Sequence, residues 1–227
     1  DIIFNIFRTA RLRLKKEKCS FGVESVDYLG FRVSSEGCSL SPQRLQAISE
    51  YPIPQSTDVL HSFLGMANFF RHLIKNFSLI SASLYSLLPI KSSAKKKLAI
   101  VQTKEYVTTF ETLRHALLTA KLLAHVDYTK DLVLRTDASL LGIGAVLLNG
   151  SVDDPTNLVP VYFLSKKFND TEQKYSTIVQ ECQAIYWSVT KLSSFLLGHY
   201  FYIQTDHKNL TFKNFSIEKA NKMESNT

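Results

Sequence analysis

Two aspartates in the C-terminal half stand at positions where a carboxylate can do chemistry. Asp137 and Asp206 each close a short apolar stretch, residues 132–134 and 200–205, of the kind typical of a β-strand. A charge at the end of such a strand is costly to leave partly buried unless something pairs with it. A third acid, Glu181, lies between them in the sequence. Three carboxylates that converge without Cys or His suit a hard, oxygen-preferring cation such as Mg²⁺.

The direction of Glu181 follows from the apolar residues around it, which recur at helical spacing. At about 100° per residue, the centre of this apolar stripe lies about 80° from Glu181. The stripe consists of Tyr175, Ile178, Val179, Cys182, Ile185, Tyr186, Val189, Leu192 and Leu196. Glu181 is therefore expected on the flank of the buried face, where a helix packed on a sheet can aim it toward the two strand ends.

Each of the three acids also has an ordinary explanation as a local cap or a surface residue. The separations, 44 residues from Asp137 to Glu181 and 25 from Glu181 to Asp206, do not show which elements pair. From the residues alone, an acidic metal site and three unrelated acids both stay open.

The elements expected to position these acids form an α/β arrangement over residues 131–210. Apolar runs separated by turn residues predict strands near 132–134, 142–148, 159–163 and 200–205. Asn169-Asp170-Thr171 predicts the cap of a long helix that reaches about Leu197 and is closed by Gly198.

The N-terminal half has a different pattern, with helical periodicity over most of its length. Helices are expected at residues 3–14, from Ser41-Pro42 to about Pro52, from Thr57 to about Ile74, at 81–88 and at 104–119. Alternating residues 21–33 predict strands that continue through a Gly37 turn. The polar stretch 91–97 predicts a linker.

Charge is distributed unevenly between the halves. The net charge is +7, but residues 1–130 carry 18 Lys and Arg against 10 Asp and Glu, and residues 131–227 carry 9 against 10. A basic half beside a neutral half indicates a surface for a polyanion next to a site of another kind, or simply a solvated helix face. No apolar run is long enough to cross a membrane.

The three cysteines indicate a reducing, intracellular environment. Cys19, Cys38 and Cys182 are widely spaced and form no Cys-x-x-Cys pair. We expect buried structural thiols without a role in catalysis or metal binding.

Several ordered motifs resemble the reverse transcriptase–ribonuclease H region of Gypsy-type LTR retrotransposon Pol polyproteins. The resemblance runs from about Phe7 to Leu210 and is collinear. Its motifs are Lys18-Cys19-Ser20-Phe21, Tyr28-Leu29-Gly30-Phe31-Arg32-Val33-Ser34, Phe63-Leu64-Gly65-Met66-Ala67-Asn68-Phe69-Phe70-Arg71, Phe110-Glu111-Thr112-Leu113, Thr136-Asp137-Ala138-Ser139, Gly142-Ile143-Gly144-Ala145-Val146-Leu147, Glu172-Gln173-Lys174-Tyr175-Ser176, Glu181-Cys182-Gln183-Ala184-Ile185 and Thr205-Asp206-His207-Lys208.

The resemblance implies an α/β fold class, or α+β for the chain as a whole. The first half is expected to be basic and mainly helical and to correspond to the thumb and connection. The second half is expected to be a ribonuclease H-like mixed α/β domain that lacks its last elements. The implied segments are the end of the reverse transcriptase palm with a primer-grip-like hairpin at 1–41, a thumb-like region at 42–90, linker and connection at 91–130, and the truncated ribonuclease H-like domain at 131–227.

The resemblance also assigns roles to individual residues. Asp137, Glu181 and Asp206 match metal-binding catalytic carboxylates that hold two Mg²⁺ ions, with Mn²⁺ as an alternative, and hydrolyse the RNA strand of an RNA–DNA hybrid. Ser139 and His207 are implied supporting residues. Contacts to a hybrid or template–primer duplex are expected from Arg11, Arg13, Lys15, Lys16, Tyr28, Gly30, Arg71 and Lys75. Hybrid is then selected by its width and its 2′-hydroxyls, since phosphate contacts position without specifying.

Two motifs of the family do not occur in this sequence. One is the polymerase Tyr-x-Asp-Asp, so nucleotide transfer is expected only of a longer parent polyprotein. The other is the Ala-Asp-Ala segment that carries a fourth carboxylate; neither Glu218 nor Glu224 has a motif that replaces it. Hybrid cleavage by this chain alone is therefore expected to be weak or lost. The alternatives are a non-catalytic nucleic-acid-binding remnant of a retroelement and a decayed reading frame. The implied location is a cytoplasmic particle or the nucleus.

Overall fold

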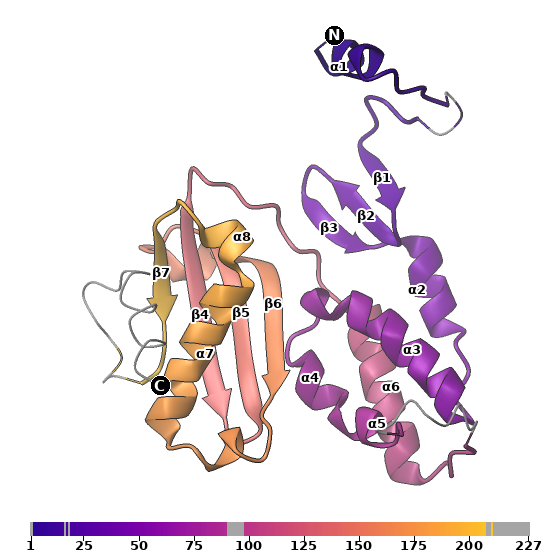
Figure 1. Ribbon diagram of the computed structural model, residues 1–227, viewed down its shortest axis with the longest axis vertical. Coiled ribbons are helices and arrows are strands. Elements are labelled where there is room, and N and C mark those ends of the chain that lie inside the picture. Colours follow the sequence, from indigo (N-terminus) through magenta and orange to yellow (C-terminus); the bar gives the residue numbers. More distant parts are fainter. Residues whose placement is uncertain (1, 16, 18, 90–97, 208–209, 211–227) are drawn as a thin grey trace.

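The computed structural model describes residues 2–15, 17, 19–89, 98–207 and 210 of the 227-residue chain. Within them a helical half with a small sheet lies beside an α/β half built on a larger sheet (Figure 1). The linker expected at 91–97, Lys16, and the C-terminal acids Glu218 and Glu224 lie outside the described residues.

The chain begins with a short helix and a three-stranded antiparallel sheet of order β1-β2-β3. These elements are α1 (Ile2–Thr9), β1 (Ser25–Tyr28), β2 (Phe31–Ser34) and β3 (Gly37–Leu40). Helix α1 buries none of its residues and lies apart from the rest of the chain in Figure 1. At Gly37 the backbone has φ 149°, and a Cβ would lie 2.1 Å from the Leu123 carbonyl oxygen. Glycine is therefore required where β3 meets the segment that leads to the second sheet.

The helical half is built from amphipathic segments around one apolar core. Its elements are α2 (Pro42–Ser49), α3 (Thr57–Phe69), the 3₁₀ turn η2 (Arg71–Leu73), α4 (Phe77–Ile80), α5 (Ala82–Ser86) and α6 (Lys104–Leu118). Ser41 caps α2, since its hydroxyl accepts the Arg44 N–H at 3.3 Å, and Pro42 occupies the first turn. Phe63 and Phe110 are fully buried at the centre of the core. The expectation of a mainly helical segment is confirmed.

The α/β half has a four-stranded sheet of order β6-β5-β4-β7, in which β7 runs parallel to β4 and the other pairs are antiparallel. The strands are β4 (Asp131–Ser139), β5 (Gly142–Gly150), β6 (Val159–Lys167) and β7 (Phe201–Gln204). Helices α7 (Thr177–Lys191) and α8 (Ser193–Leu196) cover one face of this sheet (Figure 1). Leu134 and Leu147 pack there with Leu192 and Leu196. The predicted strands are confirmed.

The helix expected to begin at Asn169 begins later, so that prediction is wrong at its start. The Asn169 carboxamide oxygen accepts the N–H groups of Thr171 and Glu172, at 3.0 and 2.8 Å. Its capping signal is real, but it serves a single 3₁₀ turn, η4 (Glu172–Lys174). Ser176 then has an extended backbone, and α7 starts at Thr177.

The buried face of α7 also differs from the predicted apolar stripe. The buried residues are Gln180, Glu181, Ala184, Ile185 and Ser188, whereas Ile178, Val179, Cys182 and Tyr186 are exposed. Glu181 is therefore near the middle of the buried face instead of on its flank. The reason is that this part of α7 packs through hydrogen bonds of polar side chains. The spacing of apolar residues, on which the prediction was based, contains no information about such bonds.

The expectation of three buried cysteines is wrong. Cys182 is exposed because it lies on the outer face of α7, and Cys19 and Cys38 are only half-buried. All three are free thiols.

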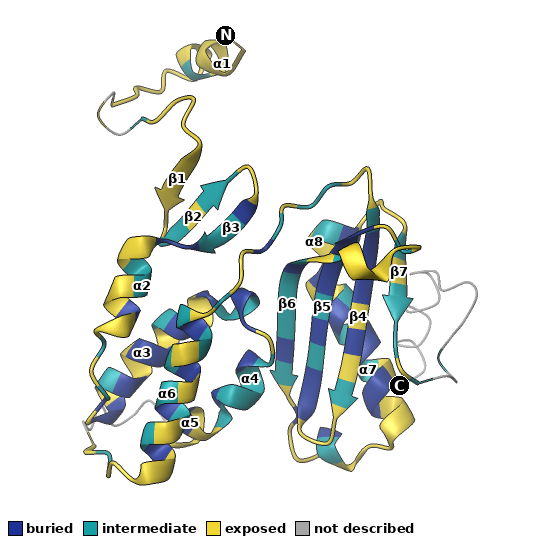
Figure 2. Ribbon diagram, turned by 180° about the vertical axis from the view of Figure 1, so that it is seen from behind, coloured by how far each residue is buried: buried dark blue, intermediate teal, exposed yellow. Residues whose placement is uncertain are grey.

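The two halves contact each other along β6. Phe163 packs against the helical core, and the His72 ring stacks on Tyr162 with the ring centroids 5.1 Å apart. Figure 2, coloured by burial, views the sheet from the side opposite α7, with β6 turned toward the helical half. Among the described residues no helix is long and apolar enough to cross a membrane.

Candidate metal centre

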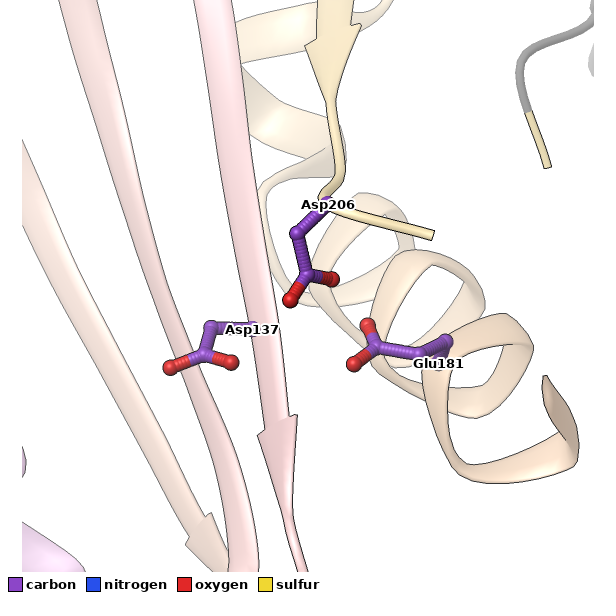
Figure 3. A group of neighbouring side chains, drawn as sticks. All are labelled: Asp137, Glu181 and Asp206. Atoms are coloured by element: carbon purple, nitrogen blue, oxygen red, sulfur yellow. The ribbon is translucent and has the colours of Figure 1, made fainter. Parts of the chain in front are cut away.

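The structure brings Asp137, Glu181 and Asp206 together at one edge of the larger sheet (Figure 3). Asp137 lies near the end of β4, Asp206 follows β7, and Glu181 projects from α7. One ligand oxygen of each residue lies within 4.8 Å of the others, and this is the group of potential metal ligands found in the part of the chain that the structure describes.

The short length of β7 creates this site. The β7–β4 pairing ends at Gln204 and Arg135, and none of the described residues forms a strand on the outer edge of β4 beyond that point. Glu181 occupies the edge instead: the Ala138 N–H donates to Glu181 Oε1 at 3.2 Å. The strand edge thus fixes the Glu181 carboxylate next to Asp137, the neighbour of Ala138 in the sequence.

The electrostatics of the cluster favour a cation. Glu181 is only 2% exposed, and its Oε2 is buried without a hydrogen-bond partner among the described residues. Burial raises the pKa of Glu181, and the charges of Asp206 and Asp137 raise it further, while the Ala138 N–H and His207 act in the opposite direction. A metal ion would supply the missing partner for Oε2. Because all three donors are carboxylate oxygens, the residues fit a hard cation such as Mg²⁺.

The two predicted supporting residues lie near this cluster. The Ser139 hydroxyl donates to the Gly142 carbonyl at 3.2 Å and accepts the Leu141 N–H, so it stabilises the β4–β5 turn. His207 directly follows Asp206, and its Nδ1 is buried without a partner among the described residues. A role for either residue in the reaction stays a prediction.

The N-terminal basic residues lie far from the carboxylates. Arg11, Arg13 and Lys15 are exposed in the segment after α1, which extends away from the body of the protein in Figure 1. Tyr28 is also exposed, at the end of β1. These residues are accessible to a nucleic acid, but the structure does not join them to the metal cluster.

The remaining predicted contact residues divide by environment. Gly30 has φ 85°, and a Cβ there would lie 3.1 Å from both Arg44 Nε and Phe70 Cζ, so its position already has a packing reason. Arg71 donates to the Ser165 carbonyl at 2.7 Å and to Ser78 Oγ at 2.9 Å, which commits its guanidinium to the contact between the halves. Lys75 is exposed.

Two residues near the cluster were missed from the sequence. Arg135 is exposed two residues before Asp137, and this spacing puts both on the same face of β4, a signal that was available. Its Nε donates to Gln204 Oε1 at 3.1 Å. Asn76, from the helical half, lies against Gly144 of β5. No local signal could have found Asn76, because its place depends on how the two halves dock.

A mixed sheet covered by one main helix, with three carboxylates converging at a strand edge, defines an α/β domain with a candidate divalent-metal centre. The family comparison makes the class more specific. Residues 103–203 match the family described as "RNase H-like domain found in reverse transcriptase". The match extends from the start of α6 to β7, so it includes Asp137 and Glu181, and Asp206 follows directly after it.

Relatives of known type cover almost the whole chain. The chain is 34% identical to the retrovirus-related Pol polyprotein from transposon 297 of Drosophila melanogaster, over 99% of its own length and 20% of the relative's. The chain is also 35% identical to the retrovirus-related Pol polyprotein from transposon gypsy of Drosophila melanogaster, over 93% of the chain and 20% of the polyprotein. The chain thus corresponds to about a fifth of a Pol polyprotein of this kind, and the expected resemblance is confirmed.

Solved structures confirm the fold. The structure of a foamy viral protease-reverse transcriptase in complex with RNA/DNA hybrid superposes with a TM-score of 0.74 at 23% identity, covering 99% of this chain and 29% of the other. The structure of the foamy viral protease-reverse transcriptase in complex with dsDNA superposes with a TM-score of 0.76 at 25% identity, covering 97% of this chain and 43% of the other. The α/β class with a ribonuclease H-like domain is therefore established.

Proposed function

We propose that the α/β half hydrolyses the RNA strand of an RNA–DNA hybrid in a Mg²⁺-dependent reaction. The observation that carries this proposal is the cluster of Asp137, Glu181 and Asp206, with a buried Glu181 oxygen that lacks a partner among the described residues. The family match and the hybrid bound by a structural neighbour support RNA–DNA hybrid as the substrate class.

The residues of the cluster have different positions and therefore different roles. Glu181 is buried and anchored by the Ala138 N–H, so it serves as a fixed ligand. Asp137 and Asp206 are exposed, so they hold metal on the side from which a phosphate approaches. Two divalent ions, when bound, supply an activated water and stabilise the leaving oxygen. Mg²⁺ is the proposed metal, and Mn²⁺ offers the same ligand chemistry.

Basic residues outside the cluster are proposed to hold the nucleic-acid backbone. Arg135 lies on the same strand face as Asp137, and Lys75 is exposed between η2 and α4, two elements that contact β6. Arg11, Arg13 and Lys15 add contacts farther along a duplex. Such contacts set position and salt dependence, not sequence preference. The other partner is the rest of a Pol polyprotein, and the proposed location is a cytoplasmic particle or the nucleus.

A cleavage assay with the purified chain tests the proposal. Because the fourth carboxylate motif does not occur in this chain, weak RNA-strand cleavage of a labelled hybrid is expected in Mg²⁺ and none in EDTA, and Asp137→Asn is expected to reduce it at least about 100-fold. Asp153→Asn, which changes an exposed acid in the β5–β6 connection, is the matched control and should retain activity. Cleavage that persists in Asp137→Asn, or that needs no divalent metal, contradicts the assignment.

A nucleic-acid-binding role without cleavage is the second candidate, and the exposed basic residues of the N-terminal segment favour it. It predicts hybrid affinity that falls steeply with salt and is unchanged by Asp137→Asn. Salt-dependent binding without any Mg²⁺-dependent product selects this function over the nuclease.

A further inference from the structure

The helical half docks onto a specific row of the nuclease sheet. Asp137 of β4 pairs with Gly144 of β5, and Gly144 pairs with Ser165 of β6. Residues paired in this way point to the same face, so these three form one row across the sheet. Arg135, two positions before Asp137, shares this face and is exposed, whereas Thr136 is buried toward α7. The row therefore lies on the face opposite α7, which is turned to the viewer in Figure 2.

Hydrogen bonds to Ser165 hold the helical half on this row. The Ser78 N–H donates to Ser165 Oγ at 2.9 Å, and the Ser78 hydroxyl donates to the Ser165 carbonyl at 2.9 Å. Arg71 donates to the same carbonyl at 2.7 Å. Because Ser165 is buried, these bonds are shielded from water and fix the position of the segment that contains Ser78.

Two residues before Ser78, Asn76 reaches the middle of the row. A Cβ on Gly144 would lie 3.0 Å from Asn76 Oδ1, so the carboxamide occupies the space that a side chain would fill. Directly paired residues have Cβ positions about 4.5–5.5 Å apart on one face of a sheet. Asn76 therefore stands next to the position from which the Asp137 carboxylate projects, although it comes from the other half of the chain.

The Asn76 side chain is not used to stabilise the fold. Its backbone is left-handed, with φ 57°, and its side chain does not cap the four-residue helix α4 that follows. Its backbone carbonyl accepts the N–H groups of Leu79 and Ile80, but its side chain makes no hydrogen bond to the residues that the structure describes. The Arg71 side chain, by contrast, donates hydrogen bonds to Ser78 and Ser165 and so helps to hold the two halves together. Asn76 thus places a free donor and a free acceptor beside a carboxylate of the proposed metal site.

We propose that Asn76 is a positioning residue for the RNA strand, contributed to the nuclease by the helical half. A carboxamide both donates and accepts hydrogen bonds, as does a ribose 2′-hydroxyl, whereas deoxyribose offers neither at this position. Asn76 contacts a 2′-hydroxyl of the strand that lies over Asp137, and so favours hybrid over duplex DNA. This inference rests on the proposed hybrid cleavage for its substrate class.

Asn76→Gly in the full chain tests the proposal, because glycine tolerates the left-handed backbone and removes only the carboxamide. Affinity for hybrid and for duplex DNA of the same sequence is measured in EDTA by fluorescence anisotropy. Loss of one hydrogen bond is expected to weaken hybrid binding about 3- to 10-fold and to leave DNA binding unchanged. Asn157→Gly, the same change in an exposed residue of the β5–β6 connection, should alter neither.

A second variant tests whether the effect of Asn76 on hybrid affinity depends on its contact with Gly144. Gly144→Ala forces the Asn76 oxygen to move by a few tenths of an ångström, so it should reduce hybrid affinity in the native chain. The same change should have no further effect in the Asn76→Gly background. An additive loss in the double variant would contradict the contact.

The outcomes separate this proposal from the proposed function. An unchanged hybrid-to-DNA affinity ratio in Asn76→Gly, or an equal loss for both duplexes, overturns the role of Asn76 even if the native chain cleaves hybrid. Absence of Asp137-dependent cleavage overturns the proposed function, while a selective loss of hybrid binding in Asn76→Gly still supports the contact.

Discussion

Replacing Glu181 with Gln separates its contribution to metal binding from its cost to the fold. In the metal-free protein the carboxylate is buried, Oε2 lacks a donor, and two further carboxylates lie close by. An amide of the same size keeps an oxygen for the Ala138 N–H, and its NH₂ group can donate to Asp137 or Asp206. We therefore expect Glu181→Gln to stabilise the metal-free protein.

The separation of the carboxylates sets the magnitude. At 4.8 Å, two unit charges repel by about 0.9 kcal/mol in water and by about 3.5 kcal/mol at an effective dielectric constant of 20. Asp137 and Asp206 are exposed, so a value near the lower end applies to each of the two pairs. The expected gain is about 2 kcal/mol, which raises the Tm of a chain of this size by about 4–8 °C.

Thermal unfolding with and without Mg²⁺ is the assay. In EDTA the Glu181→Gln variant should melt at a higher temperature than the native chain. Added Mg²⁺ should raise the Tm of the native chain by mass action and should have much less effect on the variant. Glu36→Gln, in the exposed β2–β3 turn, is the control and should match the native chain in both conditions.

Two results would refute the reasoning at different points. A lower Tm of Glu181→Gln than of the native chain in EDTA would mean that the Glu181 carboxylate stabilises the metal-free protein. Repulsion between the three carboxylates would then not destabilise the fold. If the variant has a higher Tm in EDTA but its Tm still rises with Mg²⁺ as much as that of the native chain, the carboxylates repel one another, but the metal binds at another site.

Two further predictions concern the surroundings of the site. Burial alone would raise the pKa of Glu172, but hydrogen bonds from Lys166, the Asn169 N–H and Gln183 hold it below its ordinary value. Glu172→Ala should therefore cost about 2 kcal/mol in urea unfolding at pH 7. This loss shrinks as the pH falls below about 4.3, the ordinary pKa of a glutamate, because the unfolded chain then takes up a proton that native Glu172 does not yet bind. Burial lowers the pKa of His72, so protonation favours the unfolded chain. Native stability should fall by up to about 1.4 kcal/mol per pH unit below about pH 6.5, and His72→Phe should reduce this dependence in melts at pH 7.5 and 5.5.

The parts of the fold that could be predicted are those that local chemistry determines. Ser41-Pro42 specifies a helix start through a capping hydroxyl and a restricted φ, and the structure has that helix. Asn169 also carries a capping signal, and Glu172 completes it by accepting the Asn169 N–H at 2.9 Å, yet only one 3₁₀ turn follows before the backbone becomes extended at Ser176. Capping signals thus locate a turn reliably, but not the length of the helix after it.

The candidate site shows the same division between local and nonlocal information. From the types of Asp137, Glu181 and Asp206 and from the two strand ends, a metal site was one of two possibilities that stayed open. Their convergence could not be predicted, since it depends on β7 ending opposite Arg135. Asn76 was out of reach because no spacing in the sequence relates it to Gly144.

Helix α7 explains how the fold sustains an unfavourable cluster. Its N-terminal part is held by polar bonds: the Gln180 side chain donates to the Glu172 carbonyl at 3.1 Å, and Glu181 accepts the Ala138 N–H. Apolar packing begins within the helix, where Ala184 clusters with Ile143 and Phe168, and continues after its end, where Leu192 and Leu196 are buried against the sheet. This packing offsets the repulsion of the carboxylates. Truncation of Leu192 to Ala should therefore loosen the helix, whereas Glu181→Gln changes only the repulsion within the cluster and the binding of metal.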